Sequence, residues 1–465
     1  PEARVLDRLI ESFLLGDPIP AADLPEDAAT DLIALGMLAR QSDRLVPLRE
    51  VRPYGEPDTN WFVVADLGAP SNPGHVLGPG GASLTLARIT PRRAGGRAMD
   101  LGCGAGVQAL HAARHLERIV ATDTNPRALE RTALSAALSG VPAERIELRA
   151  GSLFEPVAGQ AFDLIVSNPP FVISPGHRFT YRDAGLTGDE LSRAVVRGAA
   201  EHLAPGGLAV VLVNWLLLAG QEWRDRVCGW VADTGVNAWI VARERQSVAD
   251  YAATWLRDAQ APDGPEFDAA MDQWLDAFDQ MGAEAVGFGW VVLAAPDISP
   301  GGPAGNSPGA ATTRGSGPAV AQPDPWVHVE DLVHAERLPS GAEVLTFVAG
   351  CATTESMSVP DLLDAPARLV PRATISTTTL VCGAGTQTPA PPRLGLAGTI
   401  GPGGWRPALT VHPVLLAALL AEHDAPLGDR LDLAAQAEGL EPLDVLGPAL
   451  TGLRELIRVG IVRTH

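Results

Sequence analysis

The sequence predicts an α/β protein with a Rossmann-like sheet of seven strands, flanked by a small α+β module at each end. Three observations support this prediction. Strand-like apolar runs alternate with helical stretches between residues 76 and 294, which requires crossover connections and a mostly parallel sheet covered on both faces. A glycine-rich turn joins the first run to a helix. A stretch rich in proline and glycine, 295–325, separates this region from the remaining residues and is expected to be a flexible linker.

Residues 1–75 are expected to form a small helical domain with a β-hairpin. Apolar pairs recur at helical spacing over residues 5–14, and a second helix is expected at 28–38. A polar turn then leads to the strand-like run 44–48. Helices followed by a short hairpin are typical of winged-helix-like accessory modules, which position a protein or nucleic-acid partner.

The central domain, residues 76–294, contains the seven expected strands. They are residues 98–101, 119–122, 146–148, 162–166, 208–213, 239–241 and 289–293. Helical stretches lie between most of them. His111 and His115 fall four residues apart on the first helix and are expected at its surface, because no further metal ligand accompanies them. Asp189 lies just before a later helix. It is explained as part of a solvated helix N-terminus as well as by a role in a substrate cleft.

Residues 326–465 are expected to form a C-terminal accessory domain. Its first part is predicted to be strand-rich, with strands at 344–348 and 374–381, and its end is predicted to be helical. Residues 455–463 echo residues 31–40, each with an apolar helix, a glycine and a short strand-like run. Either this similarity is chance, or two winged-helix-like modules flank the central domain.

The composition of the 465 residues limits the possible chemistry. Lysine is absent and the net charge is −20, which excludes lysine Schiff bases and a Walker-type lysine, and disfavours a basic nucleic-acid-coating protein. The four cysteines form no CxxC pair, so no metal site and no disulfide framework is expected, and a cytoplasmic location is the simplest reading. The longest apolar run, 208–219, is interrupted by Asn214 and is too short for a membrane span.

The glycine-rich turn points to a nucleoside ligand. It runs from Asp100 to Gly106, with glycines at alternate positions that let the backbone approach a bound molecule. Asp123 follows the next strand, where a carboxylate can accept hydrogen bonds from two ribose hydroxyls. Phosphate-binding loops avoid an anion such as Asp100 beside the phosphate. A carboxylate suits a cationic ligand, so the turn favours S-adenosylmethionine over NAD.

A second motif, Asn168-Pro169-Pro170-Phe171, follows the strand at 162–166. With these two motifs the sequence resembles class I S-adenosylmethionine-dependent methyltransferases of the amino-methylating type, over about residues 76–294. The resemblance implies that Asn168 and the carbonyl of Pro169 accept the two N–H hydrogens of the target nitrogen. It also implies that Pro170 stiffens the turn and that Phe171 stacks on a planar amide or base.

The resemblance also assigns the cofactor site. The family segment G-D-L-F-x-P, whose acid contacts the adenine amino group, corresponds to residues 151–156, where Ser152 replaces the acid. A serine hydroxyl can still accept this hydrogen bond, but more weakly. Ser83 or Thr85 is expected near the methionine end of the cofactor. The expected cofactor contacts are Asp100, Gly102, Cys103, Gly104, Gly106, Asp123, Ser152, Leu153 and Asn168.

Two substrates are open for the expected N-methyltransferase, and a protein glutamine side chain is preferred over an exocyclic amine of a nucleic acid. The stretch around Asp183 resembles one that shapes the substrate cleft in release-factor glutamine methyltransferases, which favours a protein glutamine, on a translation factor for example. The Phe171 form of the motif and the winged-helix-like flanks favour an exocyclic amine of ribosomal or other RNA. A DNA base, a small molecule and an inactive binding module are further alternatives.

The net charge is unevenly distributed along the chain. Residues 76–248 hold 18 arginines and 16 acids, whereas residues 249–294 hold one arginine and nine acids. Both flanking regions are acidic as well. The acidity therefore lies outside the expected transfer site, and it weakens the case that the flanking modules bind a phosphate backbone.

Overall fold

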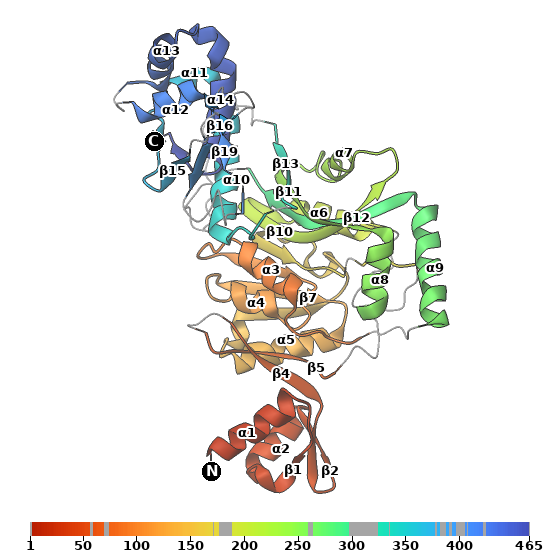
Figure 1. The fold of residues 1–465 in the computed structure, drawn as a ribbon. Helices are drawn as coiled ribbons and strands as arrows, with labels where there is room; N and C mark the ends of the chain where they lie inside the picture. Colours follow the sequence, from red (N-terminus) through yellow and green to blue (C-terminus); the bar gives the residue numbers. More distant parts are fainter. Residues whose placement is uncertain are drawn as a thin grey trace.

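The computed structural model centres on one eight-stranded sheet (Figure 1). The structure describes residues 2–55, 59–68, 74–170, 172–175, 188–258, 264–296, 324–333, 335–376, 379–381, 387–389, 393–396, 405–406, 408–421 and 425–464. The strand order is β13-β11-β12-β10-β9-β6-β7-β8. The strands of this sheet are β6 Arg97–Leu101, β7 Arg118–Asp123, β8 Ile146–Ala150, β9 Phe162–Ser167, β10 Leu203–Leu218, β11 Asn237–Ser247, β12 Ala283–Ala294 and β13 Val327–Asp331.

The sheet is mostly parallel, as the sequence predicts. All seven expected strands are present, and β12 alone runs antiparallel to its two neighbours, β10 and β11. The eighth strand, β13, lies beyond the predicted linker and pairs parallel with β11. The chain runs outward from β6 through β7 to β8, and then returns to β9 on the other side of β6. A reversal of this kind opens a crevice at the carboxyl ends of the two central strands, where α/β proteins bind ligands.

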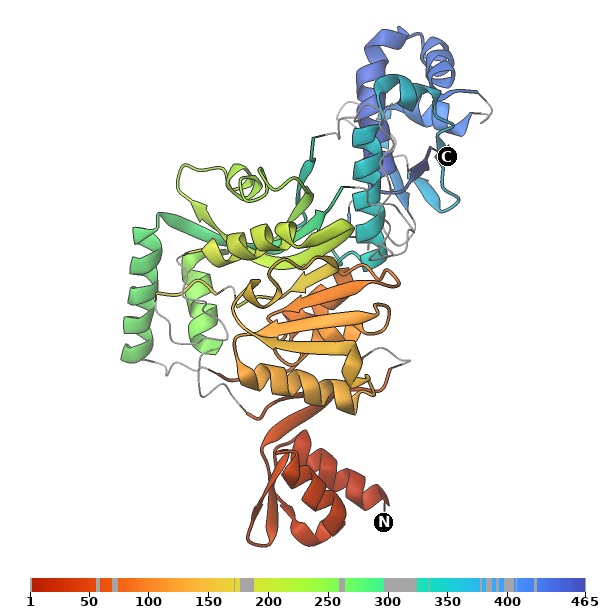
Figure 2. The same ribbon diagram turned by 180° about the vertical axis from the view of Figure 1, so that it is seen from behind.

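Helices cover both faces of the sheet (Figure 2). One face packs against α3 Gly81–Ile89, α4 Val107–Ala112 and α5 Pro126–Leu138, and the other against α6 Glu190–Glu201 and α7 Trp223–Cys228. The helical pair α8 Val248–Asp258 and α9 Pro265–Gln280 connects β11 to β12. Short 3-10 turns η2 Ala143–Arg145 and η3 Glu155–Val157 flank β8.

The N-terminal part combines two helices with a small antiparallel sheet of order β1-β3-β2. Its elements are α1 Glu2–Phe13, β1 Ile19–Pro20, η1 Ala21–Asp23, α2 Glu26–Ala34, β2 Leu38–Gln41 and β3 Arg44–Pro47. The hairpin of β4 Arg49–Tyr54 and β5 Trp61–Asp66 then reaches α5, where the amide of Val64 donates to Ser135 Oγ at 2.9 Å. Asp66 binds Arg127 and Arg131 of α5 as well, so the predicted boundary at residue 75 falls after a hairpin that packs on the central sheet's helices.

The C-terminal part is mainly helical where the structure describes it. Its helices are α10 Gly341–Ser356, α11 Val359–Asp364, α12 Pro413–Leu420, α13 Leu427–Ala437 and α14 Pro442–Arg458. Its strands are β14 Arg368–Leu369, β15 Ala373–Ser376, β16 Thr379–Val381, β17 Gln387–Pro389, β18 Arg393–Leu396, β19 Leu409–Thr410 and β20 Val462–Arg463. The predicted strand at 374–381 corresponds to β15 and β16. The predicted strand at 344–348 is wrong, because these residues lie inside α10.

The sequence echo has the same backbone geometry at both ends of the chain. After α2, Gly36 adopts φ +64° and donates to the carbonyl of Ile33, and after α14, Gly460 adopts φ +74° and donates to that of Ile457. The following strands differ in their partners, because β2 forms a hairpin with β3 whereas β20 pairs with β14. The two ends of the chain lie at opposite ends of the molecule (Figure 1). Among the described helices, none has the length and apolar character that crossing a bilayer requires.

Candidate active site

The sequence motifs meet at one edge of the sheet. In the parallel register, Leu101 of β6 lies beside Thr122 of β7 and beside Ser167 of β9. The turns that follow these strands therefore start side by side. Ser167, fully buried, donates a hydrogen bond from its Oγ to the carbonyl of Leu101 at 2.9 Å and fastens the two central strands where they end. The glycine turn and the Asn168 turn are thus neighbours.

The glycine turn has the form of a cradle. Gly102, Gly104 and Gly106 adopt φ values of +72°, +53° and +86°, which disfavour any residue with a Cβ. Among the described residues, no atom lies within 4 Å of a Cβ built on Gly102 or Gly104, so both face space open to a ligand. A Cβ on Gly106 would lie 3.0 Å from Thr132 Cγ2. Two glycines thus leave room for a bound molecule, and the third allows α4 and α5 to pack.

The turn is anchored from behind by Thr132, which the sequence analysis did not single out. Its hydroxyl donates to the carbonyl of Gly104 at 3.0 Å and lies 3.3 Å from the sulfur of Cys103. Burial raises the pKa of the Cys103 thiol well above its usual value, so this cysteine stays a thiol. Thr132 is inconspicuous in an ordinary amphipathic helix, and only the fold brings it under the turn.

Asp123 ends β7 beside the glycine turn, as predicted. Its Oδ2 accepts a hydrogen bond from the amide of Gly104 at 3.0 Å and its Oδ1 accepts one from the amide of Asn125 at 2.9 Å. Burial raises the pKa of Asp123, and both backbone hydrogen bonds oppose that rise. Each carboxylate oxygen keeps further lone pairs, so the group can still accept hydrogen bonds from ribose hydroxyls.

Asp100 is more deeply buried than a ligand-contacting group usually is. It is 1% exposed, and its Oδ2 accepts a hydrogen bond from the amide of Ala109 in α4 at 2.9 Å. Burial raises the pKa of Asp100 to about 7, the Ala109 hydrogen bond opposes this rise, and the charge of Asp123 adds to it. Asp100 therefore both fixes the start of α4 and carries a carboxyl group that titrates near neutral pH.

The segment after β8 lies at the same edge. The amide of Gly151 donates to the carbonyl of Asp123 at 3.1 Å, which ties this segment to the predicted ribose position. Ser152 is exposed, and Leu153 adopts a left-handed φ of +47°, uncommon for a residue with a side chain. The exposed Ser152 hydroxyl is thus accessible to a ligand beside Asp123.

The Asn168 turn leaves the sheet directly after Ser167. Asn168 is half-buried and Pro169 is buried, so the turn sits against the protein with its first side chain partly accessible. Phe171 and Asp183, both predicted to contact the substrate, lie outside the described residues.

The segment before α3 approaches the same region from the N-terminal side. Asn125, which follows Asp123 closely, donates from Nδ2 to the carbonyl of Gly74 at 2.9 Å. Gln108 of α4 donates from Nε2 to the carbonyl of Ser83 at 2.9 Å. These bonds hold the chain before α3, and the first turn of α3 with Ser83, close to the glycine turn.

Asp189 is not part of a solvated helix end. It is 3% exposed and accepts two hydrogen bonds from the guanidinium group of Arg226, at 2.5 and 2.6 Å. It also accepts a hydrogen bond from the amide of Leu216 at 2.9 Å. A cation more than 30 positions away in the chain compensates this acid, and the sequence has no local sign of such a pairing.

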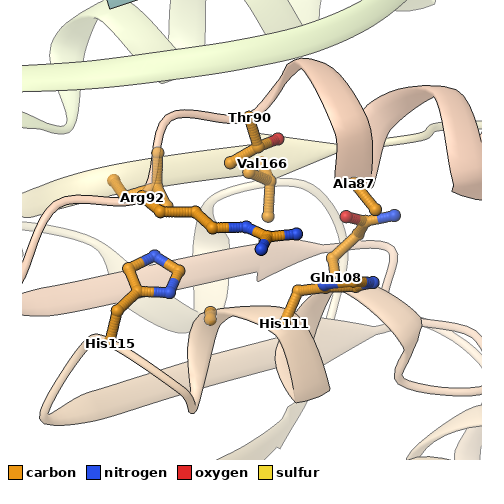
Figure 3. Close-up of a pocket in the computed structure, with 9 residues that line it drawn as sticks. Ala87, Thr90, Arg92, Gln108, His111, His115 and Val166 are labelled. Atoms are coloured by element: carbon orange, nitrogen blue, oxygen red, sulfur yellow. The ribbon is translucent and has the colours of Figure 1, made fainter. Parts of the chain in front are cut away.

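A small pocket lies apart from these motifs, under α3 and α4 (Figure 3). Arg92, Gln108, His111 and His115 surround it, and none of the predicted site residues lines it. The expectation of a surface position is wrong for His111, which is 9% exposed and lies with its Nε2 2.7 Å from the Tyr54 hydroxyl. Burial lowers the pKa of His115, with a smaller effect from Arg92. The hairpin of β4 and β5 packs against α4 at His111, through Tyr54. Nothing in the sequence indicated this contact.

Within the described residues, no group of three or more His, Cys, Asp and Glu side chains could hold a metal ion. The polar groups at the carboxyl edge are instead carboxylates, backbone groups, an amide and a hydroxyl. Such a set recognises a nucleoside and a cationic group by hydrogen bonds and charge.

Residues 80–221 are similar to a known family. This segment matches the family model of the methyltransferase small domain. The chain is also 33% identical over 214 residues to the "Ribosomal RNA small subunit methyltransferase C" of Escherichia coli O157:H7 and of Shigella flexneri serotype 5b. The match covers 44% of this chain and 58% of each relative. The resemblance to the class I N-methyltransferase group is thereby confirmed for the central segment.

Solved structures also align with part of the chain. The YcgJ protein from Bacillus subtilis aligns over 46% of this chain and 98% of its own, with a TM-score of 0.32 and 14% identity. An S-adenosylmethionine-dependent methyltransferase from Thiobacillus denitrificans, in complex with S-adenosyl-L-homocysteine, aligns over 46% and 90% with a TM-score of 0.26 and 17% identity.

Proposed function

We propose that the domain containing the matched segment 80–221 binds S-adenosylmethionine and transfers its methyl group to a planar nitrogen. The observation that carries this proposal is the adjacency of the glycine turn and the Asn168 turn, fastened by the Ser167–Leu101 hydrogen bond. One turn suits a nucleoside-bearing cofactor and the other suits an N–H donor. A methyl group can pass between them only if both lie at the same edge of the sheet.

The described residues fit this cofactor. Gly102 and Gly104 face open space, and Asp123 beside them offers carboxylate lone pairs to the ribose hydroxyls. The ionised form of Asp100 suits the positive charge of the sulfonium and ammonium groups. Ser152 offers its hydroxyl to the adenine amino group. Leu153 and Cys103 are the remaining proposed contacts to the cofactor. When bound, the cofactor supplies an electrophilic methyl group.

The acceptor turn supplies orientation. The side-chain carbonyl of Asn168 and the backbone carbonyl of Pro169 accept the two N–H hydrogens of the target. This points the nitrogen lone pair at the methyl group and stabilises the positive charge that develops on nitrogen. Pro170 restricts the turn, and Phe171 is proposed to stack on the target plane.

We place an exocyclic amine of ribosomal RNA ahead of a protein glutamine as the substrate. The relatives described above are named for ribosomal RNA, and the Phe171 form of the motif agrees with them. A glutamine of a translation factor is the second candidate, supported by the residues around Asp183. We propose 1–75 and 326–465 as accessory domains that position the substrate, with the linker 295–325 before the second. Each is docked on the central domain, the first by the β4–β5 hairpin and the second by β13.

The test is label transfer from methyl-tritiated S-adenosylmethionine to a cell extract, divided between nuclease and protease digestion. Label that nuclease removes supports the RNA substrate, and label that only protease removes supports glutamine. Calorimetry on the same protein measures cofactor binding. Absence of binding to the intact chain would leave the inactive-module alternative and reject the enzyme.

A further inference from the structure

A tyrosine far along the chain holds the segment that follows the Asn168 turn. Tyr251 of α8 is fully buried, and its Oη accepts a hydrogen bond from the amide of Ile173 at 2.9 Å. Ile173 stands five positions after Asn168 and is 3% exposed. α8 belongs to the helical pair between β11 and β12, so this contact joins two distant parts of the chain.

Two residues of the Asn168 turn have no backbone donor of their own. Pro169 and Pro170 have no N–H group, so neither can donate to the protein behind it. The buried amide of Ile173 needs an acceptor, since an unpaired buried amide is costly. Residues 172–175 form no helix or strand, and a side chain supplies the acceptor. The described chain after the prolines is thus fixed by Tyr251.

Buried polar side chains hold the tyrosine hydroxyl in place. Asn214 of β10 is 1% exposed, and its Nδ2 donates to Tyr251 Oη over a longer distance of 3.4 Å. Asn214 Oδ1 accepts from the hydroxyl of Ser192 in α6 at 3.2 Å. This chain of groups explains the asparagine that interrupts the apolar run 208–219. A satisfied polar network in a core rigidifies the elements that it joins.

An aromatic cluster restricts the tyrosine ring. Phe278 of α9 meets the ring edge-on at a centroid distance of 5.8 Å, and Phe288 of β12 lies 5.7 Å away. Trp255 and Trp274 lie 6.0 and 6.1 Å away. With its ring enclosed, Tyr251 cannot change rotamer without disturbing four neighbours. Figure 1 shows α8 and α9 next to each other at one side of the sheet, close to β12.

We propose that Tyr251 is a positioning residue for methyl transfer, which acts by setting the place of the Asn168 turn through Ile173. This inference rests on the proposed function. The acceptor carbonyls must hold the target nitrogen in line with the methyl group, and a displacement of about 1 Å costs about 100-fold in rate. The cofactor turns themselves are held by other residues, Ser167, Thr132 and Asp123.

The test compares Tyr251→Phe with Phe278→Leu in the full chain. Tyr251→Phe removes the hydroxyl and keeps the ring. Phe278→Leu disturbs the same cluster and leaves the hydrogen bond. The substrate probe is small-subunit ribosomal RNA transcribed in vitro. We expect kcat to fall at least tenfold in Tyr251→Phe, with the dissociation constant for S-adenosylmethionine within twofold, and kcat to stay within twofold in Phe278→Leu.

Hydrogen exchange separates this inference from the proposed function. The amide of Ile173 should exchange at least tenfold faster in Tyr251→Phe and at an unchanged rate in Phe278→Leu. Asn214→Ser removes the hydrogen bond that Asn214 donates to the Tyr251 hydroxyl, and the Ile173 amide should then exchange at an intermediate rate. If Tyr251→Phe does not fold, Asn214→Ser is the test variant in its place. Unchanged exchange at Ile173, or an unchanged kcat, overturns the role of Tyr251. A wild-type chain that binds no S-adenosylmethionine overturns the proposed function, whatever the exchange result.

Discussion

Asn168 is the residue on which the proposed chemistry depends most directly. Asn168 is half-buried and follows the last residue of β9. Packing in the hydrophobic core does not explain a polar amide at this position. The neighbouring Ser167 provides the structural anchor instead. Asn168 can therefore be changed with little effect on the sheet itself.

We expect Asn168→Ala to lower methyl transfer by about 100-fold or more, because the target amine loses a positioned acceptor. The dissociation constant for S-adenosylmethionine should rise much less than the rate falls, because Asn168 is only one of the expected cofactor contacts and the cofactor turn is held by Thr132 and Asp123. Rates with tritiated cofactor and calorimetry check the two parts. A fully active variant would refute the role assigned to Asn168.

Asp100 makes a pH-dependent contribution to cofactor binding. Its pKa is about 7 in the ligand-free protein because the carboxyl group is buried. A cationic ligand favours the ionised form, so binding below this pH requires loss of a proton. Affinity for S-adenosylmethionine should therefore rise with pH, by at most about tenfold per unit, and level off above about pH 7.

Calorimetry between pH 5.5 and 8.5, in buffers of different ionisation enthalpy, measures this dependence and the released proton. Asp100→Asn should flatten the profile, and an equally steep profile in that variant would assign the proton elsewhere.

The raised pKa of Asp100 also makes the stability of the protein depend on pH. The unfolded carboxyl group ionises near pH 4, about three units lower, so Asp100 makes the free energy of unfolding fall as pH rises from about 4 to about 7.

At the scale of single elements, the glycine turn divides two tasks among similar residues. Gly102 and Gly106 both have positive φ, but only Gly106 is enclosed by α5. The first thus serves the ligand side of the turn and the second serves packing. A pair of alanine variants can distinguish these tasks.

We expect Gly106→Ala to lower the free energy of unfolding by about 2–3 kcal/mol, from left-handed strain plus the contact with Thr132. Gly102→Ala should lose only about 1–2 kcal/mol, from strain alone, but should weaken cofactor binding about tenfold. Urea denaturation and calorimetry measure both variants. Equal destabilisation with equal binding would contradict this division.

The helix α10 illustrates why one predicted element was wrong. Val344 to Val348 is an apolar run that suits a buried strand or a buried helix. Ser340 and Glu343 ahead of it form a capping box, with Ser340 Oγ accepting from the amide of Glu343 at 3.3 Å. This signal favours a helix start and decides between the two.

At the scale of the whole molecule, the C-terminal part is joined to the central sheet rather than merely tethered to it. Strand β13 extends the sheet, and its Glu330 accepts a hydrogen bond from Trp239 Nε1 at 3.0 Å and pairs with Arg406. Trp239 packs against Phe347 of α10 at a centroid distance of 4.2 Å. The Arg406 guanidinium lies over the same phenylalanine ring, 4.7 Å from its centroid.

We expect Arg406→Leu to lower the free energy of unfolding by about 3–5 kcal/mol, because buried Glu330 loses its partner. Combining it with Glu330→Gln should recover a large part of that loss, because no charge is then left unpaired. Urea denaturation of both variants measures the difference. Equal stability of the single and double variants would show that the ion pair is not what joins the two parts.

Much of the site was predictable because its signals are local. The glycine turn, Asp123 and Asn168 each follow a strand directly, and parallel strands bring their carboxyl ends to one edge. The partners of Asp189, His111 and Asn214 were not predictable. Each is bonded by a residue more than twenty positions away in the chain, on an element that packs nearby only in the folded protein.

The sequence by itself determined the alternating α/β fold and the two turns at its carboxyl edge, because period, glycine placement and strand ends are encoded locally. Only the tertiary structure decided that β13 joins the central sheet, that α10 is a helix packed on Trp239, and that Tyr251 holds the chain after Asn168. These features depend on contacts between residues distant in sequence. The burial of apolar surface largely determines the free energy of these contacts. A single sequence does not show which distant residues pack against one another.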